Sequence, residues 1–178
     1  MTATAPPFEQ FYDLADLSEA GADVAVETSV PERERIARWA DVVSVEQFEG
    51  RVALRRLSAS RFAYEAALSA DIVQSCVVTL EPVHTHIARE FHRELHLTPA
   101  LKKAAAPGGE VPVSVTEDDG PEEIASTRFD LAAPLLEEFS LAIDPYPRAP
   151  GVEFEPPPSA KARPDSLFAV LKRLKAKD

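Results

Sequence analysis

Hydrophobic and polar residues alternate along three long segments in the middle of the chain, at 43–57, 61–73 and 83–97. In such a segment every second side chain faces the same way, so each is predicted to be a half-buried β-strand. The inward positions are Phe48, Val52 and Leu54 in the first segment, Phe62, Tyr64, Ala66, Leu68, Ala70 and Ile72 in the second, and Val83, Ile87, Phe91, Leu95 and Leu97 in the third. The connections between these segments are short, which favours antiparallel pairing, because parallel strands need long crossovers.

Shorter stretches add to this meander. Residues 22–27 alternate in the same way, with Val24 and Val26 on one side, and are predicted to be another half-buried strand. Residues 8–16 and 110–115 are expected to form short edge strands. The region 98–123, rich in breakers and acids, is otherwise expected to be a flexible loop.

Two helices are predicted from apolar residues that recur three and four positions apart. The first opens at a capping box from Ser29 to Glu32, with proline in its first turn. Its inward face is expected to hold Ile36, Trp39, Ala40 and Val43. Trp39 could instead be a stacking platform for a nucleic-acid base, but its helical spacing and acidic neighbours favour core packing.

The second helix is predicted to begin between Asp130 and Pro134 and to end before the prolines of segment 144–148. Its apolar stripe consists of Leu135, Leu136, Phe139, Ala142 and Ile143. We therefore expect one acidic α+β domain over residues 1–150. Its core would be an antiparallel β-meander or an open barrel-like sheet with two packed helices.

A proline-rich linker is predicted at 151–164, since its consecutive prolines 156–158 form a stiff spacer. Residues 165–178 are predicted to form a basic amphipathic tail helix that Asp165 caps. Its apolar stripe consists of Leu167, Val170, Leu171 and Leu174. The tail has three interpretations: it docks on a partner, it contacts RNA phosphates, or it frays or folds back on its own acidic body.

The charge of the chain is unevenly distributed. The net charge is −11, and residues 161–178 contribute +4, which leaves −15 for residues 1–160. An acidic body repels phosphate backbones and attracts basic partners. The single cysteine, an N-terminal segment unlike a secretory signal, and the lack of a long apolar run indicate a cytoplasmic protein with no membrane association.

Four histidines, His84, His86, His92 and His96, fall on even positions of one predicted strand. Two of them could share a metal ion, with Glu90 or Glu94 as a further ligand, in a metal-dependent enzyme. The favoured interpretation is the solvent-facing side of an antiparallel sheet.

Cys76 could be a nucleophile beside one of these histidines, but activation of a thiol needs a positive local field. The neighbours of Cys76 are neutral, so a buried structural thiol is predicted. No phosphate loop, nucleophile elbow or zinc-protease helix occurs in the sequence, which indicates a protein without enzymatic activity, cofactor or small-molecule substrate.

Three motifs follow one another along the chain, at 74–82, 141–148 and 164–174. The first motif contains Cys76, Leu80, Glu81 and Pro82, and the second contains Asp144, Pro145, Tyr146, Pro147 and Arg148. The third reads Pro-Asp-Ser-Leu-Phe-Ala-Val-Leu-Lys-Arg-Leu. In this order and spacing they resemble the YceD family, the large ribosomal RNA subunit accumulation proteins, in the form typical of alphaproteobacteria. Many relatives have Cys-x-x-Cys at the first motif, whereas Thr79 stands at the second cysteine here, so a metal role is not transferred.

The resemblance implies a cytoplasmic, non-enzymatic factor for the accumulation or processing of large-subunit (23S) rRNA. Because the body is acidic, we expect it to bind a basic large-subunit ribosomal protein or an assembly factor. The tail would make a second contact with the partner or with rRNA, through Leu167, Phe168, Leu171, Lys172, Arg173, Leu174, Lys175 and Lys177. The rival hypothesis is a direct RNA binder that uses Arg51, Arg55 and Arg61 on an exposed strand face together with the tail.

Overall fold

The structure is a computed structural model that describes residues 5–98 and 120–153. The elements in chain order are β1 (Phe11–Asp13), the 3-10 helix η1 (Leu14–Asp16), β2 (Ala22–Glu27), α1 (Val30–Trp39), β3 (Ser44–Arg56), β4 (Arg61–Ser75), β5 (Pro82–Leu97), β6 (Glu122–Ile124), β7 (Arg128–Asp130) and α2 (Ala132–Ala142).

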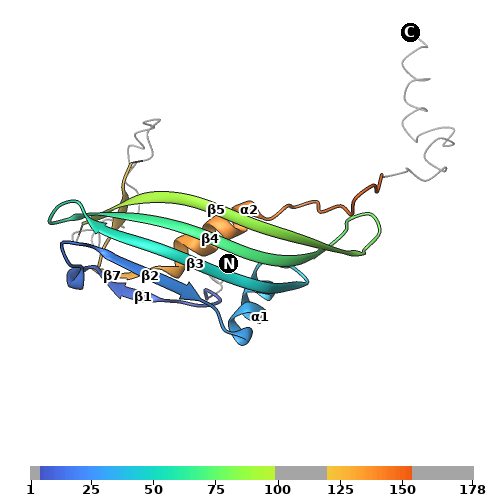
Figure 1. Cartoon of the computed structure of the whole chain (residues 1–178), viewed down its shortest axis with the longest axis horizontal. Helices are drawn as coiled ribbons and strands as arrows, with labels where there is room; N and C mark the ends of the chain where they lie inside the picture. The colour runs from blue at the N-terminus through green and yellow to red at the C-terminus, as the bar shows by residue number, and fades with distance from the viewer. Residues whose placement is uncertain (1–4, 99–119, 154–178) are drawn as a thin grey trace, which may run out of the picture.

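Five strands form the main sheet in the order β2-β3-β4-β5-β6 (Figure 1). The first four pair as an antiparallel meander, and β6 adds to β5 in parallel. The strands β1 and β7 form a separate antiparallel pair. The predicted α+β class with an antiparallel meander is confirmed. Within the part of the chain that the structure describes, the sheet is open, with β2 and β6 as its two edges.

One face of the sheet forms the core, and both helices pack on that side. The even positions of β4 from Phe62 to Ile72 are all buried, as the alternation predicts. Phe139 of α2 meets Phe48 of β3 edge to face, with ring centroids 5.3 Å apart. Gly50 of β3 allows this close approach, since a Cβ atom there would lie 2.5 Å from Leu135 Cδ1.

A bulge in β3 shifts the alternation by one position. Val45 and Phe48 are both buried although one is odd and the other even, and the pairing with β4 shifts between Val45 and Gln47. The bulge inserts one residue without a partner, so the strand is inward-facing at Val45 and again from Phe48 onward.

The capping box of α1 is confirmed, but two of its predicted core positions are wrong. Trp39 is 37% exposed and Val43 is 63% exposed. The helix ends at Trp39, and Asp41 has a left-handed φ of 54°, so the chain turns before Val43 can reach the helix face. Ile36 and Ala37 are the buried residues of this helix.

The structure corrects only the end of the expected loop 98–123, because β6 begins at Glu122 and its residues pair with Leu95–Leu97 of β5. Residues 99–119 of this loop lie outside the described residues. The expected edge strand at 8–16 is present as β1, whose partner β7 was not predicted. The expected strand at 110–115, residues 154–164 of the linker and the tail helix lie outside the described residues.

Candidate functional site

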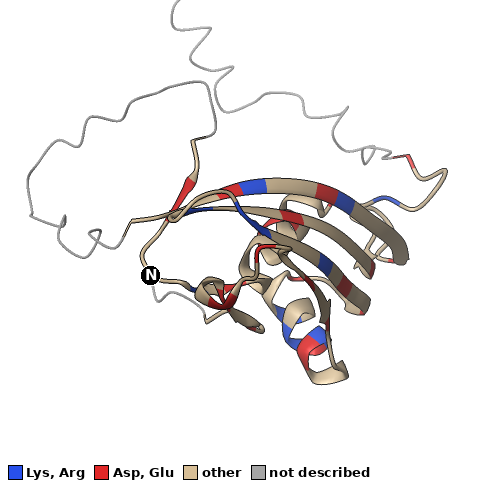
Figure 2. Ribbon diagram, turned by 60° about the vertical axis from the view of Figure 1, so that its left-hand side comes forward, with Lys and Arg blue, Asp and Glu red and all other residues tan. Residues whose placement is uncertain are grey.

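The second face of the sheet, which we call the open face, lies opposite both helices. It is formed by the odd positions of β4 and their cross-strand neighbours. Its charged members are the carboxylates of Asp23, Glu27, Glu49, Glu65, Asp71, Glu90 and Glu94 and the guanidinium groups of Arg51, Arg55 and Arg61. Figure 2 shows acidic and basic positions interspersed along these strands. Carboxylates outnumber arginines, so the open face is acidic.

The open face is hollowed across β2 to β5. A depression of about 780 Å³ lies over small side chains such as Ala25, Ala53 and Ala67. Its charged and polar rim consists of Asp23, Arg51, Glu65, Glu90 and His92. A second depression of about 370 Å³ continues it past Glu27 and Glu49. A cationic side chain that enters this face therefore meets carboxylates on several strands.

Two of the three arginines are already paired with carboxylates of the same face. Arg55 lies 3.0 Å from Asp23, and Arg61 forms an ion pair with Glu94. Among the described residues, Arg51 has no ion pair within 4.0 Å. The positive charge that the rival RNA-binding hypothesis needs is thus largely neutralised within the protein.

The histidines of β5 are on the solvent side, as predicted. His86 Nδ1 lies 2.7 Å from Asp71 Oδ1, and His84 Nδ1 lies 4.0 Å from Glu46 Oε2. Within residues 5–98 and 120–153, no three side chains of His, Cys, Asp or Glu are grouped as metal ligands. Each of these two histidines is instead placed beside a single carboxylate.

The first two sequence motifs meet at one end of the sheet, in what we call the motif junction (residues 74–82 with 143–149). The backbone N–H of Val77 donates to the carbonyl oxygen of Pro147 over 2.9 Å. The side-chain amide of Gln74 donates to the carbonyl oxygen of Asp144, also over 2.9 Å. Figure 1 shows the segment after α2 running beside the β4–β5 turn. Segments far apart in sequence are therefore one structural unit.

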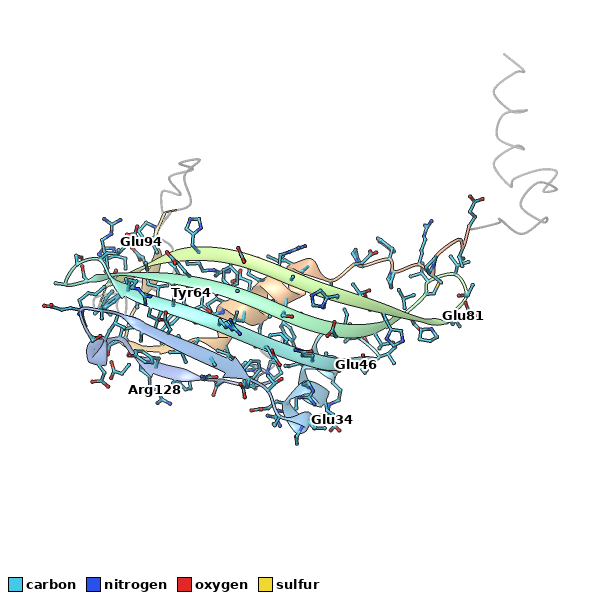
Figure 3. All side chains as sticks on the ribbon, viewed as in Figure 1. Glu34, Glu46, Tyr64, Glu81, Glu94 and Arg128 are labelled. Atoms are coloured by element: carbon cyan, nitrogen blue, oxygen red, sulfur yellow. The ribbon has the colours of Figure 1, made fainter. Side chains whose placement is uncertain are left out.

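Other motif residues shape this unit. Asp144 Oδ1 accepts a hydrogen bond from the backbone N–H of Tyr146 at 2.8 Å, which closes the turn between the two prolines of the second motif. Leu80 has a left-handed φ of 65° in the β4–β5 turn. Glu81 stands at this end of the molecule, and Glu94 at the other (Figure 3). Pro82 opens β5, where it pairs with Ser75 at the edge of the turn. Arg148 directly precedes Ala149, whose backbone N–H contacts Cys76 Sγ.

Cys76 is fully buried, as predicted, but its surroundings are not neutral for a thiol. The backbone N–H of Ala149 approaches Sγ to 3.4 Å and that of Thr79 to 3.5 Å. A hydrogen bond from the Thr79 hydroxyl, aided by the N–H groups of Ala149, Thr79 and Val78, lowers the pKa of the thiol from 9.0 to about 6, and burial opposes the shift. The Thr79 hydroxyl also donates to Glu81 Oε2 over 3.2 Å. Backbone donors thus supply a positive field that the neighbouring residue types did not indicate.

The tail residues predicted as a binding site, from Leu167 to Lys177, lie outside the described residues. Of the acidic members of the open face, only Glu90 and Glu94 were singled out from the sequence, as possible metal ligands, and the acidic face as a whole was not predicted. The signal for this face is the alternation of the two strands: the odd positions of β4 and the even positions of β5 face this side, which places Glu65 and Glu90 on the same side of neighbouring strands. Among the described residues, no helix is long and apolar enough to cross a membrane.

Comparison with known proteins gives one match. The model of a family described as large ribosomal RNA subunit accumulation protein YceD matches residues 64–175, more than half of the chain. This range contains most of β4, the elements from β5 to α2 and both segments of the motif junction. No curated protein and no solved structure matches the chain.

Proposed function

Because the chain belongs to the YceD family of large ribosomal RNA subunit accumulation proteins, we propose that it is a non-enzymatic, cytoplasmic ribosome biogenesis factor. It supports the accumulation or processing of 23S rRNA by binding a basic large-subunit ribosomal protein, or an assembly intermediate that exposes one. The open face is the surface that receives this partner.

The acidic character of the open face is the observation that supports this function. Its carboxylates lie on four adjacent strands around a depression, and Arg55 and Arg61 are held in internal ion pairs. Complementary charge speeds association and excludes partners of the same sign. Lysine and arginine side chains of a ribosomal protein match this surface, whereas RNA phosphates are repelled by it.

The tail would act alongside this face. Residues 161–178 have a net charge of +4, and Lys172, Arg173, Lys175 and Lys177 could contact rRNA phosphates while the acidic body holds the protein partner. With an acidic body and a basic tail, the factor would connect a ribosomal protein to the rRNA on which that ribosomal protein assembles.

The test is affinity capture of the tagged full-length chain from cells, with and without ribonuclease. We expect a basic large-subunit protein to remain bound after ribonuclease treatment. Loss of all bound protein on ribonuclease treatment would instead support direct RNA binding through Arg51 and the tail.

A charge-matched pair of variants locates the contact. Glu65→Gln with Glu90→Gln removes two negative charges from the open face and should weaken capture of the basic protein. Glu9→Gln with Glu34→Gln removes the same charge from exposed positions outside the sheet and should leave capture unchanged. Equal capture by both variants would exclude the open face as the contact surface.

A further inference from the structure

A groove of about 530 Å³ lies beside the motif junction, and we call it the junction groove. It is lined by residues 40–43 after α1, by Gln74, Ser75 and Val77 at the end of β4, and by 143–145 and Pro147 after α2. Nine large hydrophobic side chains are exposed in the described part of the chain. Two of them, Val43 and Val77, line this groove. Three more, Leu80, Leu141 and Tyr146, lie within three positions along the chain of residues that line it. Such a concentration of exposed apolar surface marks an interaction site.

The turn that carries Leu80 adds a second reason to look for an occupant. Leu80 is 76% exposed and has a φ of 65°, a conformation that glycine adopts without strain and leucine does not. Its backbone N–H is fixed by a 2.9 Å hydrogen bond to the carbonyl oxygen of Cys76. The strained backbone presents an apolar side chain to solvent, which favours function over stability as the reason for this residue.

We propose that the junction groove is occupied by the chain's own C-terminal segment, residues 166–175. Leu167, Val170, Leu171 and Leu174 recur at the spacing of one helix face, which is the pattern of a helix that lays its apolar side into a groove. This stripe matches the exposed apolar residues of the groove in chemical character.

The chain leaves the fold at the groove itself. Ala149 contacts Cys76 inside the motif junction, and the described residues end at Glu153. The spacer of residues 154–165 contains three consecutive prolines. A chain of this length spans roughly 20 Å as a flexible coil and roughly 37 Å as an extended polyproline chain, and either length keeps the segment tethered near the groove. A segment tethered this close has an effective concentration of about 1 mM, so even weak intramolecular affinity fills the groove.

The charges of the two parts are complementary. The lining of the groove includes the carboxylates of Asp41 and Asp144 and has no lysine or arginine. Residues 161–178 have a net charge of +4. The family match also spans both segments of the motif junction and continues to residue 175. This intramolecular contact is independent of which partner binds the open face.

Nuclear magnetic resonance of the full-length chain tests the contact. Leu167→Asp with Leu171→Asp places charge on the apolar stripe, and we expect the backbone amide resonances of Val77, Leu80 and Tyr146 to shift. Ala169→Asp adds one negative charge to the opposite helix face and should leave them in place. Unchanged resonances in the double variant would overturn the proposal. Shifts that depend on protein concentration would also overturn it, because they would identify a second copy as the occupant.

Limited trypsin digestion tests the same contact with a substitution beside the groove instead of in the tail, and it measures the rate at which the tail is cleaved. Leu80→Gly removes the side chain and suits the left-handed backbone, so the turn is retained. We expect cleavage after Lys172 and Arg173 to accelerate severalfold, because proteolysis follows the population of the undocked tail. Leu57→Gly removes an exposed leucine from the turn at the other end of the sheet and should not change cleavage. Equal cleavage rates in wild type and Leu80→Gly would overturn the contact.

Discussion

At the Cys76 sulfur, hydrogen-bond donors occupy the place that a cationic side chain holds in most reactive-cysteine sites. The hydroxyl of Thr79 and the backbone N–H groups around it favour the thiolate and lower the pKa to about 6. The side chain is fully buried, so a low pKa here does not make an accessible nucleophile. The sulfur instead joins the β4–β5 turn to Ala149.

We predict that Thr79→Val raises the pKa of Cys76 above about 6, because it removes the donor with the largest effect. Thr79→Ser keeps a hydroxyl and is the matched control. The ultraviolet absorption of the thiolate, followed against pH in the folded protein, measures the change. The same titration midpoint in both variants would show that the backbone donors alone set the pKa.

The low pKa also predicts how stability depends on pH. A thiol whose pKa is lower in the folded than in the unfolded state stabilises the fold above its ordinary pKa, and this contribution is lost as the pH falls toward the folded value. The wild type should therefore lose stability relative to Cys76→Ala between pH 9 and pH 6. Urea unfolding across this pH range measures the free energy of unfolding of both proteins. A difference between them that does not change with pH would contradict an ionised thiol in the folded protein.

Among the elements, Arg93 of β5 connects three pieces of the fold. Its guanidinium lies 2.7 Å from Glu137 and 3.2 Å from Glu138 on α2, and 3.5 Å from Glu122 on β6. The side chain is only 22% exposed, so these ion pairs are partly shielded from solvent. This cluster explains how an acidic helix and an acidic edge strand can lie side by side.

We predict that Arg93→Met lowers the free energy of unfolding by about 1–3 kcal/mol, because three carboxylates lose their common partner and repel one another. Arg89→Met on the exposed part of the same strand is the control and should change stability by less than about 0.5 kcal/mol. Urea unfolding measures both. A destabilisation of equal size in the two variants would show that the cluster contributes nothing specific.

Across the whole molecule, a body of net charge −15 is followed by a tail of net charge +4. We expect this separation to determine which part contacts nucleic acid. Phosphate binding depends steeply on salt because counterions are released, whereas an acidic surface gains nothing from RNA. The open face and the tail are therefore expected to have different ligands.

We predict that full-length protein with Lys172, Arg173, Lys175 and Lys177 changed to alanine loses any binding to rRNA fragments near physiological salt. It should still capture the basic ribosomal protein and should associate more weakly with large-subunit precursors. Binding to rRNA across a salt series, followed by co-sedimentation, measures this. Arg33→Ala with Arg38→Ala removes positive charge from α1 and should have no effect. Tight rRNA binding by the tail variant would contradict the division of roles.

The alternation and helical spacing of hydrophobic residues were sufficient to predict most of the fold. The strands β2 to β5, their inward positions and the capping box of α1 follow from periods of two and of three to four residues, and all appear in the structure. Trp39 was misplaced because helical spacing does not show where a helix ends. The parallel strand β6 was missed because its three residues show no alternation, and β5 alone determines its position.

What the sequence by itself determined was local: which segments alternate, which residues cap, and where acidic and basic residues concentrate. Only the tertiary structure decided which distant segments meet. It joined residues 74–82 to 143–149, surrounded Cys76 with N–H donors, and gathered seven carboxylates and three arginines on one acidic face, where Arg55 and Arg61 are paired. The physical reason is that periodicity is a property of neighbouring residues. Hydrogen bonds and ion pairs between residues far apart in sequence exist only once the chain has closed the loops that bring them together.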